Sequence, residues 1–301
     1  MRIGVDFGGT KIEAAALDAE GRIIARVREK NPGEYGAALD VVKTLIERVE
    51  GEIGQSAPHV GFGTPGSISP VSGLMRNSNS LFLNGKPFAQ DLERTLARPV
   101  RLTNDANCLA ISEAAPDGAA AGARLTFAVI LGTGCGGGLA IEGRGVDGHN
   151  GVAAEFGHIP LPWPTPAEYP GPRCWCGRDN CLELWISGTG LRDDYERMSG
   201  ERPAGDVIIG RARDGDAHGR LALDNYISRL GRALAVVVNL MDPDVIVLGG
   251  GMSNTDEIYE RVRPIVLEYA FTDTFTTPIR KALHGDSSGV RGAAWLWPDE
   301  T

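Results

Sequence analysis

Three cysteines and one histidine form a pattern typical of a metal site. Cys174, Cys176 and Cys181 lie in one short segment, and His158 precedes them. Three thiolates and one imidazole supply the four ligands of a tetrahedral zinc site and leave no position open for water. The chain has five cysteines, an odd number, which favours metal ligation over a disulfide framework. The pattern therefore predicts a structural Zn²⁺ site, and free core cysteines beside an unrelated histidine are the alternative.

A second candidate is Asp105, an acidic residue that follows Asn104 at the end of a strand-like stretch. A helix is expected to begin at these two residues. The aligned amides of a helix N-terminus keep a carboxylate ionised and able to accept a proton, which a general base must do. The alternative is that Asp105 only caps the helix.

Three glycine turns offer backbone amides to an anion. The first, residues 6–11, also carries a carboxylate, a hydroxyl and an amine; the others span residues 132–134 and 249–251. Each has a plainer explanation, because a hairpin, a tight corner and a strand end also use glycine. The residues expected to contact a phosphate-bearing cofactor are Asp6, Gly8, Gly9, Thr10, Lys11, Gly132, Thr133, Gly134, Gly249 and Gly250.

The elements that position these residues follow two similar cycles. Strand patterns at residues 3–7, 12–17 and 23–27 lead into a helix whose apolar residues recur every three or four positions through residues 38–53. A second strand, glycine turn and strand begin at residue 125. Steady alternation of strand and helix, as in a doubly wound sheet, is not seen.

Two related lobes are therefore expected. A stretch rich in Ala, Gly, Pro and Asp at residues 116–122 marks the boundary between them. The small N-terminal lobe is expected to span residues 1–118, and the large lobe with the metal loop residues 119–289. A last helix, within residues 290–301, could pack on either lobe.

Composition excludes some classes of partner. The 301 residues include 30 basic and 39 acidic ones, a net charge of −9 that would repel nucleic acid. No apolar stretch approaches the length of a bilayer span, so no membrane partner is expected either. We expect a cytoplasmic protein.

Taken together, these motifs resemble those of the ROK family of sugar kinases and sugar-responsive repressors, over nearly the whole chain. The motifs that carry the resemblance, in the family's order, are residues 6–11, 65–66, 104–105, 155–158 and 174–183. Three further segments, residues 66–70, residues 77–80 with 84–85, and residues 284–292, look closest to bacterial fructokinases, also called manno(fructo)kinases.

The resemblance implies an α/β, actin-like (ribonuclease H-like) fold of two lobes with a cleft between them, ATP with Mg²⁺ as the phosphoryl donor, and a homodimer. Asp105 would be the catalytic base, and Asp6 would hold Mg²⁺ through water. The residues that would surround a hexose are Gly66, Asn104, Asp105, Glu155, His158 and Glu183.

The expected activity is that of a fructokinase, which converts D-fructose to fructose 6-phosphate, with mannose as another acceptor. A glucokinase or an N-acetylglucosamine kinase of the same family is the alternative, and a sugar-sensing protein without turnover is the alternative of another class. The sequence departs from the family pattern at Asn180, where glycine is usual. Asparagine tolerates positive φ, so the metal loop is expected to form.

Overall fold

The structure, a computed structural model, describes residues 1–297. The chain forms two compact units. Unit 1 comprises Met1–Arg124, Gly138–Ala154 and the described residues from Leu283 onward, and unit 2 comprises Leu125–Gly137 and Glu155–Ala282. These units differ from the expected lobes, because residues 119–124, 138–154 and 283–289 pack with unit 1.

Unit 1 is built on a five-stranded sheet with the order β3-β2-β1-β4-β7. The first three strands form an antiparallel meander, and β4 and β7 continue the sheet parallel to β1. The predicted strand, glycine turn and strand at the start of the chain are confirmed. The strands are β1 (Arg2–Phe7), β2 (Lys11–Leu17), β3 (Ile23–Lys30), β4 (Val60–Thr64) and β7 (Val100–Asn104).

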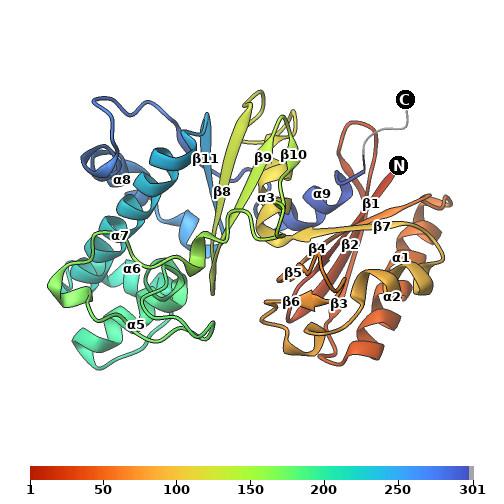
Figure 1. The fold of residues 1–301 in the computed structure, drawn as a ribbon, viewed down its shortest axis with the longest axis horizontal. Helices are drawn as coiled ribbons and strands as arrows, with labels where there is room; N and C mark the ends of the chain where they lie inside the picture. The colour runs from red at the N-terminus through yellow and green to blue at the C-terminus, as the bar shows by residue number, and fades with distance from the viewer. Residues whose placement is uncertain (298–301) are drawn as a thin grey trace. The chain divides into compact units, whose positions relative to one another are not determined.

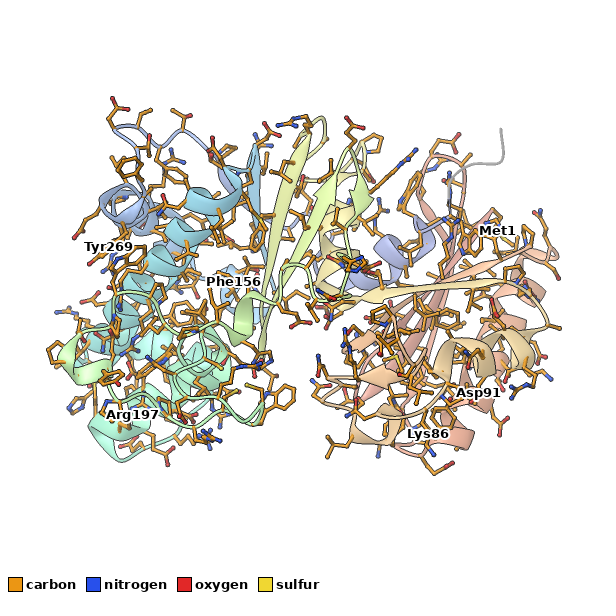
Figure 2. The ribbon with its side chains drawn as sticks, in the orientation of Figure 1. Met1, Lys86, Asp91, Phe156, Arg197 and Tyr269 are labelled. Atoms are coloured by element: carbon orange, nitrogen blue, oxygen red, sulfur yellow. The ribbon has the colours of Figure 1, made fainter. Side chains whose placement is uncertain are left out.

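Helices cover both faces of this sheet (Figure 1). On one face, α1 (Tyr35–Ile53) and α2 (Phe88–Leu96) pack against the apolar side chains of the sheet, and the predicted positions Ala38, Val42, Leu45 and Val49 are buried there. Tyr35, the first residue of α1, contacts Asp91 and Lys86, which are labelled in Figure 2. The Tyr35 hydroxyl donates to the Asp91 carboxylate at 2.7 Å, and the Lys86 ammonium lies 5.4 Å from the centre of the Tyr35 ring.

On the other face, α9 (Ser288–Ala294) packs directly on β1 and β4 beside α3 (Asp105–Ala114). Gly4 permits this approach, because a Cβ there would lie 2.1 Å from the carbonyl oxygen of Val290. The expected last helix thus belongs to unit 1, and residues 298–301 of that prediction lie outside the described residues. Short elements complete the unit: the hairpin β5 (Ser67–Ile68) and β6 (Met75–Arg76), and β10 (Arg144–Gly145).

The second sheet has the order β10-β9-β8-β11-β12. In unit 2, β8 (Leu125–Leu131), β11 (Val245–Gly249) and β12 (Ile279–Lys281) run parallel. The strand β9 (Cys135–Ile141) begins in unit 2 and ends in unit 1. The predicted second strand, glycine turn and strand are therefore confirmed.

Helix α7 (Ala217–Met241) is the central helix of unit 2. It is buried along most of its length, and its C-cap, Asp242, adopts the left-handed conformation directly before Pro243. Four helices pack around it: α4 (Glu183–Ile186), α5 (Gly188–Ser199), α6 (Gly205–Arg213) and α8 (Asp256–Tyr269). No helix within residues 1–297 is long and apolar enough to cross a membrane.

Candidate functional site

The first glycine turn of unit 1 connects β1 to β2. Asn31 stabilises the turn with two hydrogen bonds: its side-chain amide donates to the Gly8 carbonyl at 2.8 Å, and its backbone amide donates to the Thr10 carbonyl at 2.9 Å. Neither Gly8 nor Gly9 has a positive φ, so hairpin geometry does not explain these glycines. A Cβ at Gly8 would lie 2.9 Å from the Lys11 carbonyl oxygen, so tight packing of the backbone requires glycine there.

Asp6 stands at the end of β1, directly before this turn. Burial, with the nearby negative charges of Asp105 and Glu13, raises the pKa of Asp6 to about 7. Glu13 is fully buried, and its carboxylate pairs with Arg26 at 2.7 Å and with Lys11 at 3.7 Å. Three carboxylates therefore share one region of unit 1 with two cations.

Asp105 is the first residue of α3, and Asn104 is the N-cap. The Asn104 side chain accepts a bond from the Ala106 amide at 2.9 Å, and Asp105 Oδ1 accepts from the same amide at 2.8 Å. The alternative that Asp105 is itself the cap is therefore wrong. Its carboxylate lies in the first turn of α3.

Gly66 lies close to Asn104. The Asn104 side chain donates to the Gly66 carbonyl at 3.4 Å. Gly66 has φ +80°, and a Cβ there would lie 2.5 Å from the Arg76 carbonyl oxygen, so only glycine suits this turn. Unit 1 thus brings Gly66, Asn104 and Asp105 together, three of the residues expected to surround a hexose.

Unit 2 contains the predicted metal loop. One ligand atom from each of His158, Cys174, Cys176 and Cys181 lies within 4.8 Å of the other three. The Cys174 sulfur lies 3.7 Å from His158 Nδ1, and the sulfurs of Cys176 and Cys181 are 3.6 Å apart. Ligands at about 2.3 Å from a tetrahedral Zn²⁺ ion stand about 3.8 Å from one another. The four side chains therefore fit a zinc ion.

The loop folds as expected despite Asn180. Asn180 has φ +62°, so it adopts the left-handed conformation that the usual glycine would supply. Its side-chain oxygen also accepts a bond from the Trp185 indole at 2.6 Å, which glycine could not do. The departure from the family pattern therefore adds a contact to α4.

Glu183 links the metal loop to the second glycine turn. Its Oε1 accepts a bond from the Trp175 indole at 2.7 Å, and its Oε2 accepts from the Cys135 amide at 3.1 Å. The Trp175 ring in turn packs edge-on against His158, with ring centres 5.1 Å apart. Glu155 immediately precedes the short helical turn Phe156–His158 that carries the histidine ligand.

Buried charges fix the long segment that precedes the cysteines. Glu168 binds Arg229 and Arg232 of α7 at 2.8 Å each, and Arg229 also pairs with Asp194 at 2.8 Å. All four side chains are at most 8% exposed. The part of this segment from Pro162 to Glu168 is thereby held against the central helix of unit 2.

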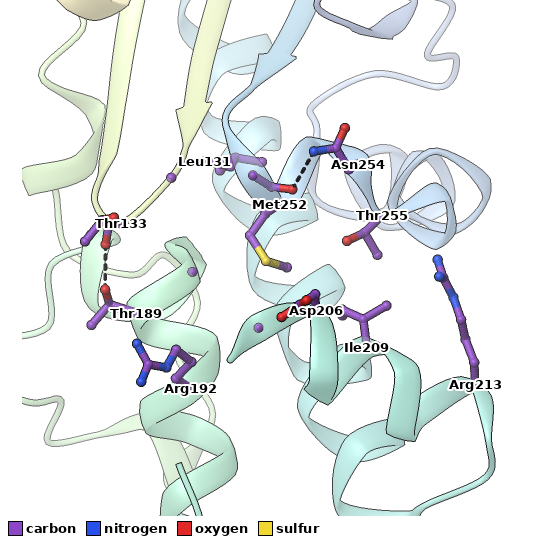
Figure 3. Close-up of a pocket in the computed structure, with 14 residues that line it drawn as sticks. Leu131, Thr133, Thr189, Arg192, Asp206, Ile209, Arg213, Met252, Asn254 and Thr255 are labelled. Carbon is purple, nitrogen blue, oxygen red and sulfur yellow. Dashed lines mark hydrogen bonds between the residues drawn. The ribbon is translucent and has the colours of Figure 1, made fainter. Parts of the chain in front are cut away.

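A cavity of about 540 Å³ opens beside the second glycine turn of unit 2 (Figure 3). Of the predicted cofactor residues, Gly132 and Thr133 line it, while Gly134, Gly249 and Gly250 do not. The remaining lining residues come from the end of β8, from α5 and α6, and from the segment after β11: Leu131, Gly188, Thr189, Arg192, Gly205, Asp206, Ile209, Arg213, Gly251, Met252, Asn254 and Thr255.

Sequence reasoning missed the contribution of α5 and α6 to this cavity. Two bonds tie α5 to the glycine turn: the Gly188 amide donates to the Gly132 carbonyl at 2.7 Å, and the Thr189 hydroxyl donates to the Thr133 carbonyl at 2.8 Å. The small residues at positions 187–190, which form the N-cap and first turn of the charged helix α5, are the signal in the sequence.

Comparison with known proteins gives consistent results. A model of the ROK family matches residues 2–300. An N-acetyl-D-glucosamine kinase of Pectobacterium carotovorum subsp. carotovorum (strain PC1) is 39% identical over 302 residues, covering 98% of each chain. The ROK hexokinase from Thermus thermophilus has a TM-score of 0.86 at 30% identity, covering 98% of this chain and 97% of that one. A ROK family glucokinase from Streptomyces griseus, solved with glucose and AMPPNP, has a TM-score of 0.81 at 28% identity, covering 98% of each chain.

Proposed function

We propose that this chain, which belongs to the ROK family, is an ATP-dependent sugar kinase whose acceptor is N-acetyl-D-glucosamine. The resemblance seen in the sequence is confirmed, and the fold is that of the actin-like ATPases. One observation carries the choice of acceptor: the 39% identity to an N-acetyl-D-glucosamine kinase extends over nearly the full length of both chains.

The acceptor differs from the first expectation. In the sequence, three short segments favour fructose, and N-acetylglucosamine is the alternative within the same family. Identity over the whole chain supports that alternative, because it samples every segment that shapes the site. Fructose stays a prediction that this relative does not support.

For the donor, we propose that ATP binds at the cavity of unit 2. A volume of about 540 Å³ lies within the range of cavities that hold small ligands, about 300–1,000 Å³. The amides of the turn that carries Gly132 and Thr133 suit phosphate oxygens. The turn at Gly8–Thr10 in unit 1 offers a second set of such amides.

For the chemistry, we assign the role of general base to Asp105. Its position at the start of α3 favours the ionised carboxylate, which would accept the proton of the attacking sugar hydroxyl. Asn104 and Gly66 would orient that hydroxyl's sugar from the same unit. Phosphoryl transfer asks the protein mainly for placement and charge neutralisation.

Mg²⁺ fits the acidic region around Asp6. Carboxylate oxygens are its usual protein ligands, and the mutual repulsion of Asp6, Glu13 and Asp105 is the kind of environment that a cation relieves. When bound, the ion would neutralise charge on the phosphates of ATP. Asp6 would bind the Mg²⁺ ion, and the ion pair between Glu13 and Lys11 would keep the Lys11 ammonium near it.

Zn²⁺ fits the cluster of His158 and the three cysteines. With all four positions supplied by the protein, the ion would order the loop and would not bind substrate. Through Trp175, that loop fixes Glu183, which we propose as an acceptor for a sugar hydroxyl together with Glu155. The expected homodimer remains a prediction.

The test is ADP release with Mg-ATP over a panel of N-acetylglucosamine, glucose, mannose and fructose. We expect the highest kcat/KM with N-acetylglucosamine. A higher value with fructose would restore the fructokinase prediction. Absence of ADP release with every sugar would contradict the kinase assignment itself.

A further inference from the structure

Two arginines line the cavity of unit 2, and they differ in their partners. Arg213 donates from Nε and Nη2 to the two carboxylate oxygens of Glu257, at 2.7 and 2.9 Å. Arg192 has no such partner: its Nε donates to the Pro203 carbonyl at 3.0 Å, and no carboxylate pairs with it among residues 1–297. Arg192 therefore brings an uncompensated positive charge to the cavity.

Asp206 also lines the cavity, but its carboxylate and the Arg192 guanidinium form no ion pair within the described part of the chain. The bond from Nε to the Pro203 carbonyl fixes one edge of the guanidinium. The two terminal nitrogens keep their donors in the planar fork that matches phosphate oxygens.

Arg192 is also close to the glycine turn. It follows Thr189 by three residues on α5, so the two side chains are neighbours on one face of the helix. The Thr189 hydroxyl donates to the Thr133 carbonyl at 2.8 Å. In Figure 3, Arg192 lies on the side of the cavity that carries Thr133 and Thr189, whereas Arg213 lies on the opposite side.

We propose that Arg192 binds the phosphate chain of the donor nucleotide and is the residue that makes affinity for the donor depend on its phosphates. This inference rests on the proposed ATP site in the same cavity. Of the two arginines that line the cavity, Arg192 is beside the phosphate-type turn and has no carboxylate partner among residues 1–297, while Arg213 is already paired with Glu257.

The experiment compares ADP with adenosine by isothermal titration calorimetry. Adenosine shares the base and ribose of ADP but has no phosphate. For R192Q we expect ADP to bind about tenfold to a hundredfold more weakly than to the wild type, as for the loss of one charge-assisted bond, and adenosine to bind equally well. R213Q should lose less ADP affinity than R192Q.

A charge-matched control is R261Q. Arg261 is exposed on α8, pairs with Asp224 and does not line the cavity, so this variant should bind both ligands like the wild type. If R192Q fails to fold by circular dichroism, R192K decides the matter. Lysine keeps the charge but not the fork, so it should lose part of the ADP affinity and none of the adenosine affinity.

Two results would overturn the inference: unchanged ADP affinity in R192Q or R192K, or an equal loss for ADP and adenosine, which would place Arg192 on the nucleoside. Both are distinct from failure of the proposed function. In that case the wild-type protein itself would bind no ADP and release none from ATP with any sugar.

Discussion

Glu168 offers a quantitative test of how the metal loop is held in unit 2. Its carboxylate is 7% exposed and accepts bonds from Arg229 and Arg232. Burial, the largest single influence, raises the pKa of Glu168, but the bonds from Arg232, the Thr165 amide and Arg229 outweigh it and lower the pKa to about 2. Compared with the usual value of 4.5, this corresponds to about 3 kcal/mol in favour of the ionised folded form.

The perturbation is Glu168→Gln. It removes the only negative charge that pairs with Arg232 among residues 1–297, and the Arg232 side chain is 2% exposed and otherwise donates to the carbonyls of Pro162 and Trp163. Breaking a buried ion pair from one side typically costs about 3 to 5 kcal/mol. The lowered pKa of Glu168 and the usual cost of breaking a buried ion pair therefore both predict a loss of about 3 kcal/mol or more in the free energy of unfolding.

The assay is urea unfolding at neutral pH with Zn²⁺ present, and Asp224→Asn is the control. Asp224 pairs with Arg261, but both side chains are about half exposed, so its loss should cost less than about 1 kcal/mol. Because the folded-state pKa of Glu168 is lowered, its contribution is complete above about pH 4.5 and is lost as the pH falls toward about 2. The difference in the free energy of unfolding between wild type and Glu168→Gln should therefore decrease when the measurement is repeated as the pH is lowered from about 4.5 toward about 2. Equal losses in the two variants would refute the reasoning.

Four further predictions concern the sites. Asp105→Asn should lower kcat by about 10²- to 10⁴-fold in the ADP-release assay while sugar binding persists; near-normal turnover would remove the base assignment. Because the pKa of Asp6 is raised to about 7, protons should compete with Mg²⁺ below that pH, so the apparent Mg²⁺ affinity should fall as the pH drops below about 7 and be constant above it. Trp175→Phe keeps an aromatic ring but loses the indole N–H that donates to Glu183, so the KM for sugar should rise. The zinc content, measured by atomic absorption, should stay unchanged. Cys176→Ser should lower both zinc content and the thermal midpoint, and full retention of both would contradict the metal site.

Much of the fold could be predicted because many helices and strands are specified by residues that are near one another in the sequence. Apolar residues at spacings of three and four marked α1, and glycine turns between short apolar runs marked both sheet openings. The packing of residues 138–154 and 283–289 with unit 1 was not predictable in this way, since it depends on contacts between distant segments. One is the buried carboxylate of Glu113, which accepts the amides of Ala119, Leu283 and His284.

The same distinction explains which parts of the site could be found. The metal ligands are three residues of one short loop plus His158, so their spacing alone identified them. The cavity of unit 2 is made by segments far apart in the chain, and each contributes residues with no distinctive chemistry by themselves. Arg192 is the clearest case, because in the sequence it is one arginine among many. Only the structure shows that Glu257 pairs with Arg213 and not with Arg192, which leaves the Arg192 guanidinium available to a ligand. A residue's chemistry is readable from sequence when its partners are near in the chain, and otherwise it depends on which neighbours the fold has already supplied.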